Sequence, residues 1–142
     1  VLFRSLGYWN QPEETEAVIR DGWFYTGDIG LLDEEGYLKI VDRKKELILC
    51  SGFNVYPSDL ENILSQHPAI LEVAVTGVPD DYRGESPKAH VVLKGEYQEE
   101  VTEDDIINWC KENMATYKRP REIEFRDSLP KSGAGKILKR LL

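Results

Sequence analysis

Cysteine and histidine are scarce in this sequence, which argues against several kinds of site. The chain holds two cysteines and two histidines. Cys50 and Cys110 have no CxxC spacing and no second pair, so neither a disulfide framework nor a zinc site is expected. We predict two small buried thiols and no metal site. His67 is expected at a helix end and His90 in a strand, without a metal-binding companion.

Long hydrophobic runs and an excess of basic residues are also absent. No apolar stretch approaches the ~20 residues that cross a bilayer, and no charged-then-apolar leader precedes the first motif. The 26 acidic and 18 basic residues give a net charge of −8, which repels nucleic acid and anionic membranes unless basic residues gather on one face. We therefore predict no transmembrane segment, no nucleic-acid partner and a soluble, cytoplasmic protein, with a peripheral position at a membrane surface left open.

The basic residues do gather in the last quarter of the sequence, between Lys118 and Arg140. A solvated face and a phosphate-facing role both remain open for them. The 142 residues are 41% apolar, which suits one modest globular domain with a core. The first residue is Val1 and the only methionine is Met114, so we expect a piece of a longer protein.

Apolar periodicity and turn residues predict an α+β fold. Helices are predicted from a start at 10–14 to Gly22, from Pro57 to His67, and after the capping residue Thr102. A last amphipathic helix is expected to begin at Ile137. Strands are predicted over 23–25, 31–32, 37–41, 47–49, 70–78, 88–93 and 122–125. The stretch 79–87 is expected to be a polar loop, and Ser58 to Glu61 fits a capping box.

The stretch VDRKKELILCSGFNVYP, from Val41 to Pro57, organises the rest of the chain. Its five consecutive ionisable residues, 42–46, must lie in solvent or face a charged ligand. A short buried strand follows, and Gly52 then permits a turn because glycine tolerates positive φ. Taken alone, these features fit a charged linker, a strand, a turn and a helix.

Two glycine-containing motifs flank this stretch: YTGD at 25–28 and PKSGAGK at 130–136. The carboxylate of Asp28 is expected at a turn, and Lys136 lies on a loop that its glycines make flexible. A nucleotidase-type phosphate loop also ends in Gly-Lys. Here Pro130 stands where that loop needs its first glycine, and Ile137 where it needs Ser or Thr for magnesium, so that reading fails.

In this order, the three motifs resemble the late signature motifs of the adenylate-forming superfamily, which includes acyl-CoA synthetases, peptide-synthetase adenylation domains and beetle luciferases. DRKKELI followed by SGFNVYP, and EFRDSLPKSGAGKILKR near the end, resemble fatty acid–CoA ligases most. The resemblance implies adenylation of a fatty acid or related carboxylate by ATP, then thioester formation with coenzyme A.

The resemblance also implies a division of the chain. Residues 1–44 would be the closing strands of a large AMP-binding domain, ending in a β-hairpin. Residues 45–142 would be the mobile C-terminal lid, with a short central sheet flanked by helices. The missing N-terminal domain would bind most of the ATP and its Mg²⁺, so this portion alone would be inactive.

Residue roles follow from the same resemblance. Asp28, together with Tyr25 and Thr26 of its motif, would bind the ATP or AMP ribose, and Arg43 would donate to ribose or phosphate. From the residues alone, an Asx turn remains open for Asp28 and a surface ion pair with Asp42 or Glu46 for Arg43.

Three further roles are implied in the lid. Lys136 would be catalytic, bridging the substrate carboxylate and the α-phosphate. Lys45 would be the hinge about which the lid rotates between half-reactions, although a lysine at a boundary is by default merely exposed. Ser51, Gly52 and Phe53 would approach the tunnel for coenzyme A.

Two alternatives stay open. An adenylation domain that loads a carrier protein shares these motifs, and a non-catalytic interaction module could have kept the lid fold alone. The presence of Asp28, Arg43 and Lys136 argues against the second alternative. Acyl chain length lies outside this sequence, because the acyl pocket belongs to the missing part.

Overall fold

The computed structural model describes residues 5–142, and the chain divides into two compact units at Lys45. The first unit ends at Lys45 and the second comprises Glu46–Leu142. A short 3₁₀ helix, η1 (Lys44–Glu46), contains the boundary. The sequence placed the boundary one residue earlier, after Lys44. Within residues 5–142, every helix is too short or too polar to cross a membrane.

The first unit begins with helix α1 (Pro12–Val18), whose first turn holds the expected proline and two acidic residues. The predicted end of this helix at Gly22 is wrong. The helix stops at Val18, and strands β1 (Ile19–Arg20) and β2 (Trp23–Phe24) pair as a hairpin. Asp21 and Gly22 form its turn with φ of 51° and 78°. Two residues at positive φ suit a tight hairpin, for which Asp-Gly is a preferred sequence.

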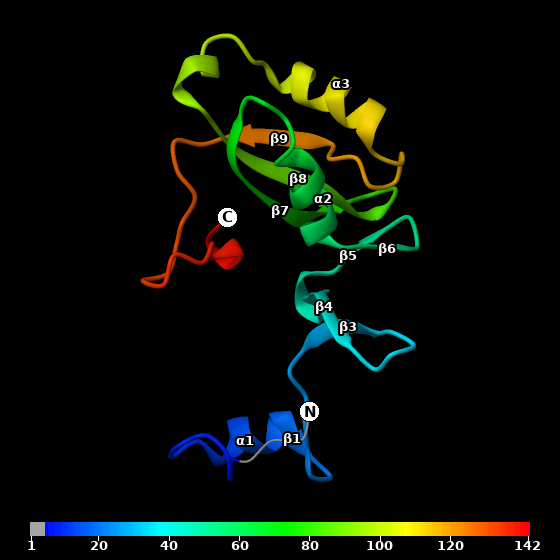
Figure 1. Cartoon of the computed structure of the whole chain (residues 1–142), viewed down its shortest axis with the longest axis vertical. Helices are drawn as coiled ribbons and strands as arrows, with labels where there is room; N and C mark the ends of the chain where they lie inside the picture. The colour runs from blue at the N-terminus through cyan, green and yellow to red at the C-terminus, as the bar shows by residue number, and fades with distance from the viewer. Residues whose placement is uncertain (1–4) are drawn as a thin grey trace. The chain divides into compact units, whose positions relative to one another are not determined.

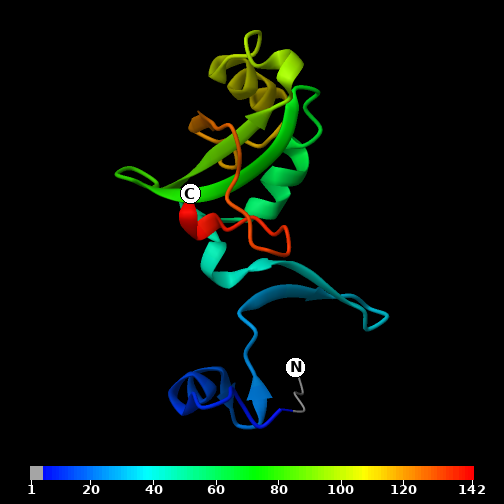
Figure 2. The ribbon, with the colours of Figure 1, turned by 90° about the vertical axis from the view of Figure 1, so that its left-hand side faces the viewer.

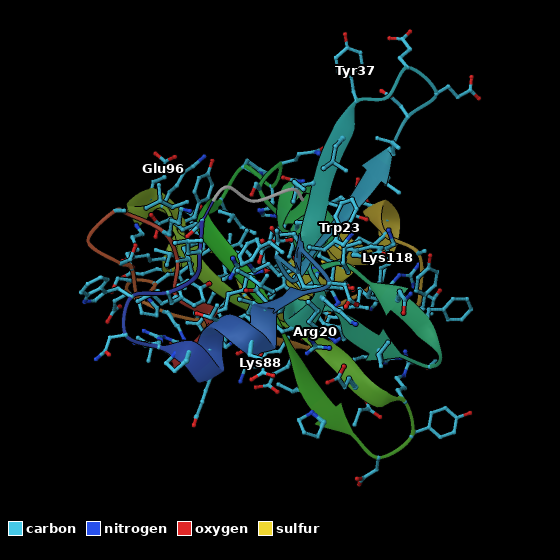
Figure 3. All side chains as sticks on the ribbon, turned by 90° about the horizontal axis from the view of Figure 1, so that it is seen from below. Arg20, Trp23, Tyr37, Lys88, Glu96 and Lys118 are labelled. Carbon is cyan, nitrogen blue, oxygen red and sulfur yellow. The ribbon has the colours of Figure 1, made fainter. Side chains whose placement is uncertain are left out.

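The second hairpin of this unit, predicted from the sequence, is confirmed. It joins β3 (Asp28–Leu32) to β4 (Leu38–Arg43), which pair antiparallel with a register shift at Ile29/Gly30. A Cβ at Gly30 would lie 2.8 Å from a methyl of Leu38 and 3.2 Å from the Lys39 carbonyl oxygen, so a side chain there would force its neighbours to shift. Tyr37 projects from the hairpin tip and is 70% exposed (Figure 3). Asp28 opens a strand rather than lying at a turn.

The second unit is built on a five-stranded sheet (Figure 1). Its strands are β5 (Ile48–Cys50), β6 (Phe53–Val55), β7 (Ile70–Asp80), β8 (Gly84–Leu93) and β9 (Glu122–Phe125). The order is β6-β5-β8-β7, and β9 pairs in parallel with β8. The α+β fold with a short sheet, as predicted, is confirmed.

The loop predicted over 79–87 is wrong, because β7 and β8 form one long hairpin through most of it. Asp80 pairs with Gly84, which leaves only residues 81–83 as a turn. The Asp80 carboxylate accepts hydrogen bonds from the backbone N–H groups of Tyr82 and Arg83, both at 3.0 Å. This local capping closes the turn and lets the strands extend further than their composition indicates.

Helices α2 (Pro57–Leu64) and α3 (Glu103–Asn113) pack on one face of the sheet. Leu60 and Leu64 of α2 and Ile106 and Cys110 of α3 are fully buried against the strands. The cap of α3 at Thr102 is confirmed, with a reciprocal capping box to Asp105. A one-turn 3₁₀ helix, η2 (Gly95–Tyr97), precedes it.

The capping box predicted for α2 is wrong. The N-cap residue is Tyr56, which makes no side-chain capping bond. Glu61 instead accepts a hydrogen bond from the Val75 backbone N–H of β7, at 2.8 Å. Proline at the first helical position needs no cap for its missing N–H, so Glu61 is available for a tertiary contact.

The opposite face of the sheet is covered by the last segment of the chain. Ala74, Val92 and Leu129 form a small buried cluster, with Ile137 and Leu142 packed against it. Figure 2 shows this segment in orange to red, turning back beside β7. The predicted terminal helix is wrong: only one 3₁₀ turn forms, η3 (Lys139–Leu141). Backbone pairing of residues 130–138 with one another keeps Ile137 extended.

Candidate functional site

The first group of predicted site residues lies where β3 begins and β4 ends. Asp28 and Arg43 are register partners in the hairpin, and Arg43 Nε lies 3.3 Å from Asp28 Oδ1. The side chain of Arg43 is 56% exposed and that of Asp28 is 27% exposed. Both can therefore reach a ligand. The Arg43 guanidinium thus pairs with Asp28, while the Arg43 backbone N–H donates to the Asp42 carboxylate at 2.7 Å.

Two hydrogen bonds, one to a side chain and one to the backbone, hold the loop before Asp28. The Thr26 hydroxyl accepts a hydrogen bond from the Asp28 N–H at 3.1 Å. The carbonyl of Gly27 accepts one from the Lys44 N–H at 2.8 Å. Gly27 has a φ of 75°, a conformation that a side chain disfavours. These contacts hold the backbone beside Asp28, and Thr26 and Gly27 also line a pocket.

The pocket has a volume of about 520 Å³ and is lined by Thr26, Gly27, Arg43, Lys44 and Lys45. Three of its five lining residues carry a positive charge. Such a lining favours an anionic ligand, while the nearby carboxylate offers acceptors for hydroxyl groups. The charges and size suit a phosphorylated sugar better than an apolar molecule.

Tyr25 is held beside this loop with an exposed ring. Its N–H donates to the Val18 carbonyl at 2.8 Å, and the Arg20 guanidinium lies 5.8 Å from its ring centroid. The ring is 58% exposed. Tyr25 does not line the pocket described above, so its part in nucleotide binding stays a prediction.

The second unit carries Lys136 on a tight turn. The Ser132 N–H donates to the Lys136 carbonyl at 2.8 Å, and the Ser132 hydroxyl accepts from the Lys136 N–H at 3.2 Å. Gly135 has a φ of 78°. The side chain of Lys136 lies on the surface. An exposed ammonium on a closed turn can meet an anion without moving the backbone.

The turn after β5 contains the residues predicted for the coenzyme A tunnel. Ser51 and Gly52 have φ of 52° and 81°, typical of a two-residue hairpin turn. Among residues 5–142, apart from its chain neighbours, no heavy atom lies within 4 Å of a Cβ built on Gly52, so its positive φ, not crowding, favours glycine. Phe53 stacks on Tyr117 with ring centroids 4.6 Å apart. Sequence reasoning missed Tyr117, which no local pattern connects to Phe53.

Lys139 and Glu61 are two further residues that the sequence did not single out. Lys139 stood among the basic residues of the last quarter, and Glu61 was assigned to a helix cap. In the fold they form an ion pair with Nζ to Oε1 at 2.7 Å. The two residues lie far apart in the chain, so only the fold brings them together.

Burial shifts the titration of several groups in the second unit. Both cysteines are free and buried, as predicted, and burial raises the pKa of the Cys110 thiol to about 11. Burial also lowers the pKa of His90 and of His67. A neutral thiol is a poor nucleophile, and Cys110 is fully buried.

Among residues 5–142, no group of three acidic, histidine or cysteine side chains is placed to bind a metal ion.

Comparison with known families gives a match over residues 59–136. The matching model describes the AMP-binding enzyme C-terminal domain. Among curated proteins, the long-chain-fatty-acid–CoA ligase of Bacillus subtilis (strain 168) is 52% identical over 136 residues. The corresponding ligase of Escherichia coli O157:H7 is 50% identical over 137 residues. Each alignment covers 96% of this chain and 24% of the relative. The chain thus spans about a quarter of the length of these relatives.

Solved structures of related enzymes have the same fold as this chain. A fatty acyl CoA synthetase of Mycobacterium tuberculosis is 44% identical with a TM-score of 0.69, over 96% of this chain and 26% of that one. ATP-bound MatB from Rhodopseudomonas palustris is 37% identical with a TM-score of 0.85, over 96% and 27%. The likeness therefore extends through both units of the chain.

Proposed function

Because this chain belongs to the family of AMP-binding enzyme C-terminal domains, we propose that it is the C-terminal part of an ATP-dependent fatty acid–CoA ligase. One observation carries the proposal: identity near 50% to long-chain-fatty-acid–CoA ligases runs over 96% of the chain. The reaction would join a carboxylate to the α-phosphate of ATP, release pyrophosphate, and pass the acyl group to the thiol of coenzyme A.

In this proposal the first unit holds the nucleotide. The Asp28 carboxylate accepts hydrogen bonds from the ribose hydroxyls, and Arg43, already 3.3 Å away, orients that carboxylate and donates to the ligand. Thr26 lines the same pocket. Tyr25 supports the loop. Mg²⁺ and most of the triphosphate would be bound by the N-terminal domain of the full-length enzyme.

The second unit supplies the charge that adenylation requires. Two anions, the fatty carboxylate and the α-phosphate, must approach each other, and the Lys136 ammonium would lie between them. A preorganised cation at developing charge is among the largest contributions to catalysis. The closed turn from Ser132 to Lys136 supports this role because it fixes the backbone that carries the ammonium.

Lys45 would be the hinge between the two half-reactions. It is exposed and ends the first compact unit, so a backbone rotation there disturbs little packing. Rotation would bring the turn of Ser51, Gly52 and Phe53 to the pantetheine arm of coenzyme A. The stacking of Phe53 on Tyr117 supports a rigid wall at that place.

The test uses the full-length enzyme with Lys136→Ala. We expect fatty-acid-dependent exchange of pyrophosphate into ATP to fall ~100 to 1000-fold, the usual cost of losing one charge-stabilising group. Thioester formation from supplied acyl-adenylate should change far less. Arg140→Ala is the matched control, because it removes an exposed cation from the same segment. Exchange within ten-fold of wild type in Lys136→Ala would overturn the assignment.

An assay of the full-length wild-type enzyme tests which molecule accepts the acyl group. We expect the acyl group to appear on coenzyme A and not on a carrier protein bearing a phosphopantetheine arm. Mass spectrometry of both acceptors, mixed in equal amount, measures this choice directly. Acylation of the carrier alone would instead favour a carrier-loading adenylation domain.

A further inference from the structure

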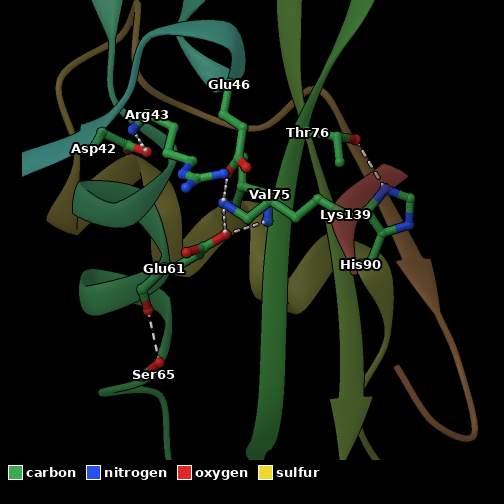
Figure 4. A network of polar contacts seen from close by, with 9 residues as sticks. All are labelled: Asp42, Arg43, Glu46, Glu61, Ser65, Val75, Thr76, His90 and Lys139. Atoms are coloured by element: carbon green, nitrogen blue, oxygen red, sulfur yellow. Dashed lines mark hydrogen bonds and ion pairs between the residues drawn. The ribbon is translucent and has the colours of Figure 1, made fainter. Parts of the chain in front are cut away.

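A partly buried ion-pair cluster lies at the end of the segment that carries Lys136. Lys139 Nζ lies 2.7 Å from Glu61 Oε1 and 3.3 Å from Glu46 Oε2 (Figure 4). The Lys139 side chain is only 18% exposed, and those of Glu61 and Glu46 are 22% and 29% exposed. The same Glu61 oxygen accepts the Val75 N–H. Lys139 of η3 thus pairs directly with carboxylates of α2 and η1, and Glu61 connects it to β7.

The other end of the segment is fastened as well. Lys131 pairs with Glu72 of β7, and Leu129 is 4% exposed in the cluster on that face of the sheet. Between the two ends, Lys131 and Ile137 pair as an antiparallel bridge. Lys136 is therefore carried on a short hairpin with a separate charged anchor on either side of it.

The contact between Lys139 and Glu46 also links the end of the chain to the start of the second unit. Glu46 is the first residue of the second unit and follows Lys45 directly. A rotation at Lys45 moves everything after it, and the contact with Lys139 ties Glu46 to the body of that unit. If Lys45 is the hinge of the proposed function, this contact would make the Lys136 hairpin turn together with the rest of the second unit.

We propose that Lys139 and Glu61 are positioning residues that fix the Lys136 ammonium for adenylation. The proposal rests on the proposed function. Neither residue needs to touch substrate, because they act through the backbone of the hairpin. Catalysis is sensitive to such support: a displacement of ~1 Å by a distant change can reduce a rate ~100-fold.

The experiment measures pyrophosphate exchange by the full-length enzyme carrying Lys139→Met, which keeps most of the side-chain volume and removes the charge. We expect kcat to fall ~10 to 100-fold while KM for ATP stays within about two-fold, because the misplaced group acts in the transition state. Lys139→Arg should restore most of the rate. In a Lys136→Ala background, Lys139→Met should cause no further loss, since the group that it positions is gone.

Lys88→Met is the matched control. Lys88 has the same 18% exposure and also pairs with two carboxylates, Glu122 and Glu124, but it has no contact with the Lys136 hairpin among its charged partners. Its kcat should equal that of wild type. An equal fall in both variants would mean a general loss of structure and would overturn the proposal.

Other outcomes are also decisive. An unchanged kcat in Lys139→Met, or an additional loss on top of Lys136→Ala, contradicts positioning through Lys136. If Lys139→Met fails to fold, Glu61→Gln answers the question, because glutamine keeps an acceptor for the Val75 N–H and loses only the charge. An unchanged kcat in the Glu61→Gln variant overturns the proposal. Full exchange by Lys136→Ala would refute the proposed function itself.

Discussion

The two units of this chain differ in what stabilises them. In the first unit, Asp42 is the only described residue that is buried, and large apolar side chains such as Trp9 and Leu31 are 95% and 64% exposed. In the second, sixteen residues form one buried cluster under α2 and α3. Large exposed apolar side chains of this kind are typical of a surface that a partner covers. The candidate nucleotide pocket therefore lies on the unit that lacks a buried apolar core, and Lys136 lies on the unit that has one.

The largest expected effect comes from separating the units. A fragment of residues 46–142 should fold alone and unfold cooperatively, because its core is complete. A fragment of residues 1–45 should show no cooperative transition, since its apolar side chains have nothing to cover them. Thermal unfolding followed by circular dichroism measures both. A cooperative transition in 1–45, or none in 46–142, would reverse the comparison.

A pair of leucine variants of the 142-residue chain sharpens the contrast residue by residue. Leu60→Ala should lower the free energy of unfolding by ~2 to 5 kcal/mol, because the side chain is fully buried between α2 and the sheet. Leu31→Ala removes the same atoms from an exposed strand and should change the free energy of unfolding by less than about 0.5 kcal/mol. Denaturant titration gives both values. Similar losses for the two variants would show that the hairpin has a core of its own.

The smallest effect is a dependence on pH that only the second unit should show. Both histidines lie there, and burial lowers the pKa of each. His90 is 2% exposed, with Nε2 3.0 Å from the Thr76 hydroxyl. In the unfolded chain both histidines take up a proton near pH 6.5, and in the folded chain they do so only at lower pH. Stability is therefore fully present above about pH 6.5 and is lost as the pH falls below it.

Denaturant titrations of the 46–142 fragment at pH 7.5 and 5.5 test this expectation. The free energy of unfolding should be smaller at pH 5.5. His90→Gln keeps a hydrogen-bonding partner for Thr76 and should reduce the difference. Greater stability at pH 5.5, or an unchanged difference in the variant, would contradict it.

The sequence predicted local structure well wherever the signal was local. Thr102 caps α3 through residues three positions away, and Pro57 opens α2 at the expected residue. The capping-box error at α2 came where a local signal competed with a distant contact. Ser58 to Glu61 has the spacing of a capping box, yet the Glu61 carboxylate is used by Val75 and Lys139.

The candidate site divides in the same way. Asp28 and Arg43 were singled out by their motifs, but only the hairpin register explains why they form a pair. The support around Lys136 was not predictable, because Lys131 contacts Glu72 and Lys139 contacts Glu61 and Glu46 across most of the unit. Side chains that meet through tertiary structure leave no periodic pattern in the sequence.

The parallel strand β9 has a consequence for how the protein is made. From Lys88 to Val91, β8 pairs with β9, which follows later in the chain, beyond α3. Until residues 122–125 leave the ribosome, that stretch of β8 presents open backbone groups, and such an edge readily pairs with other chains. Translation delivers residues slowly, at ~5 to 20 per second. A nascent chain that stalls between β8 and β9 is therefore the species most exposed to aggregation and to capture by chaperones.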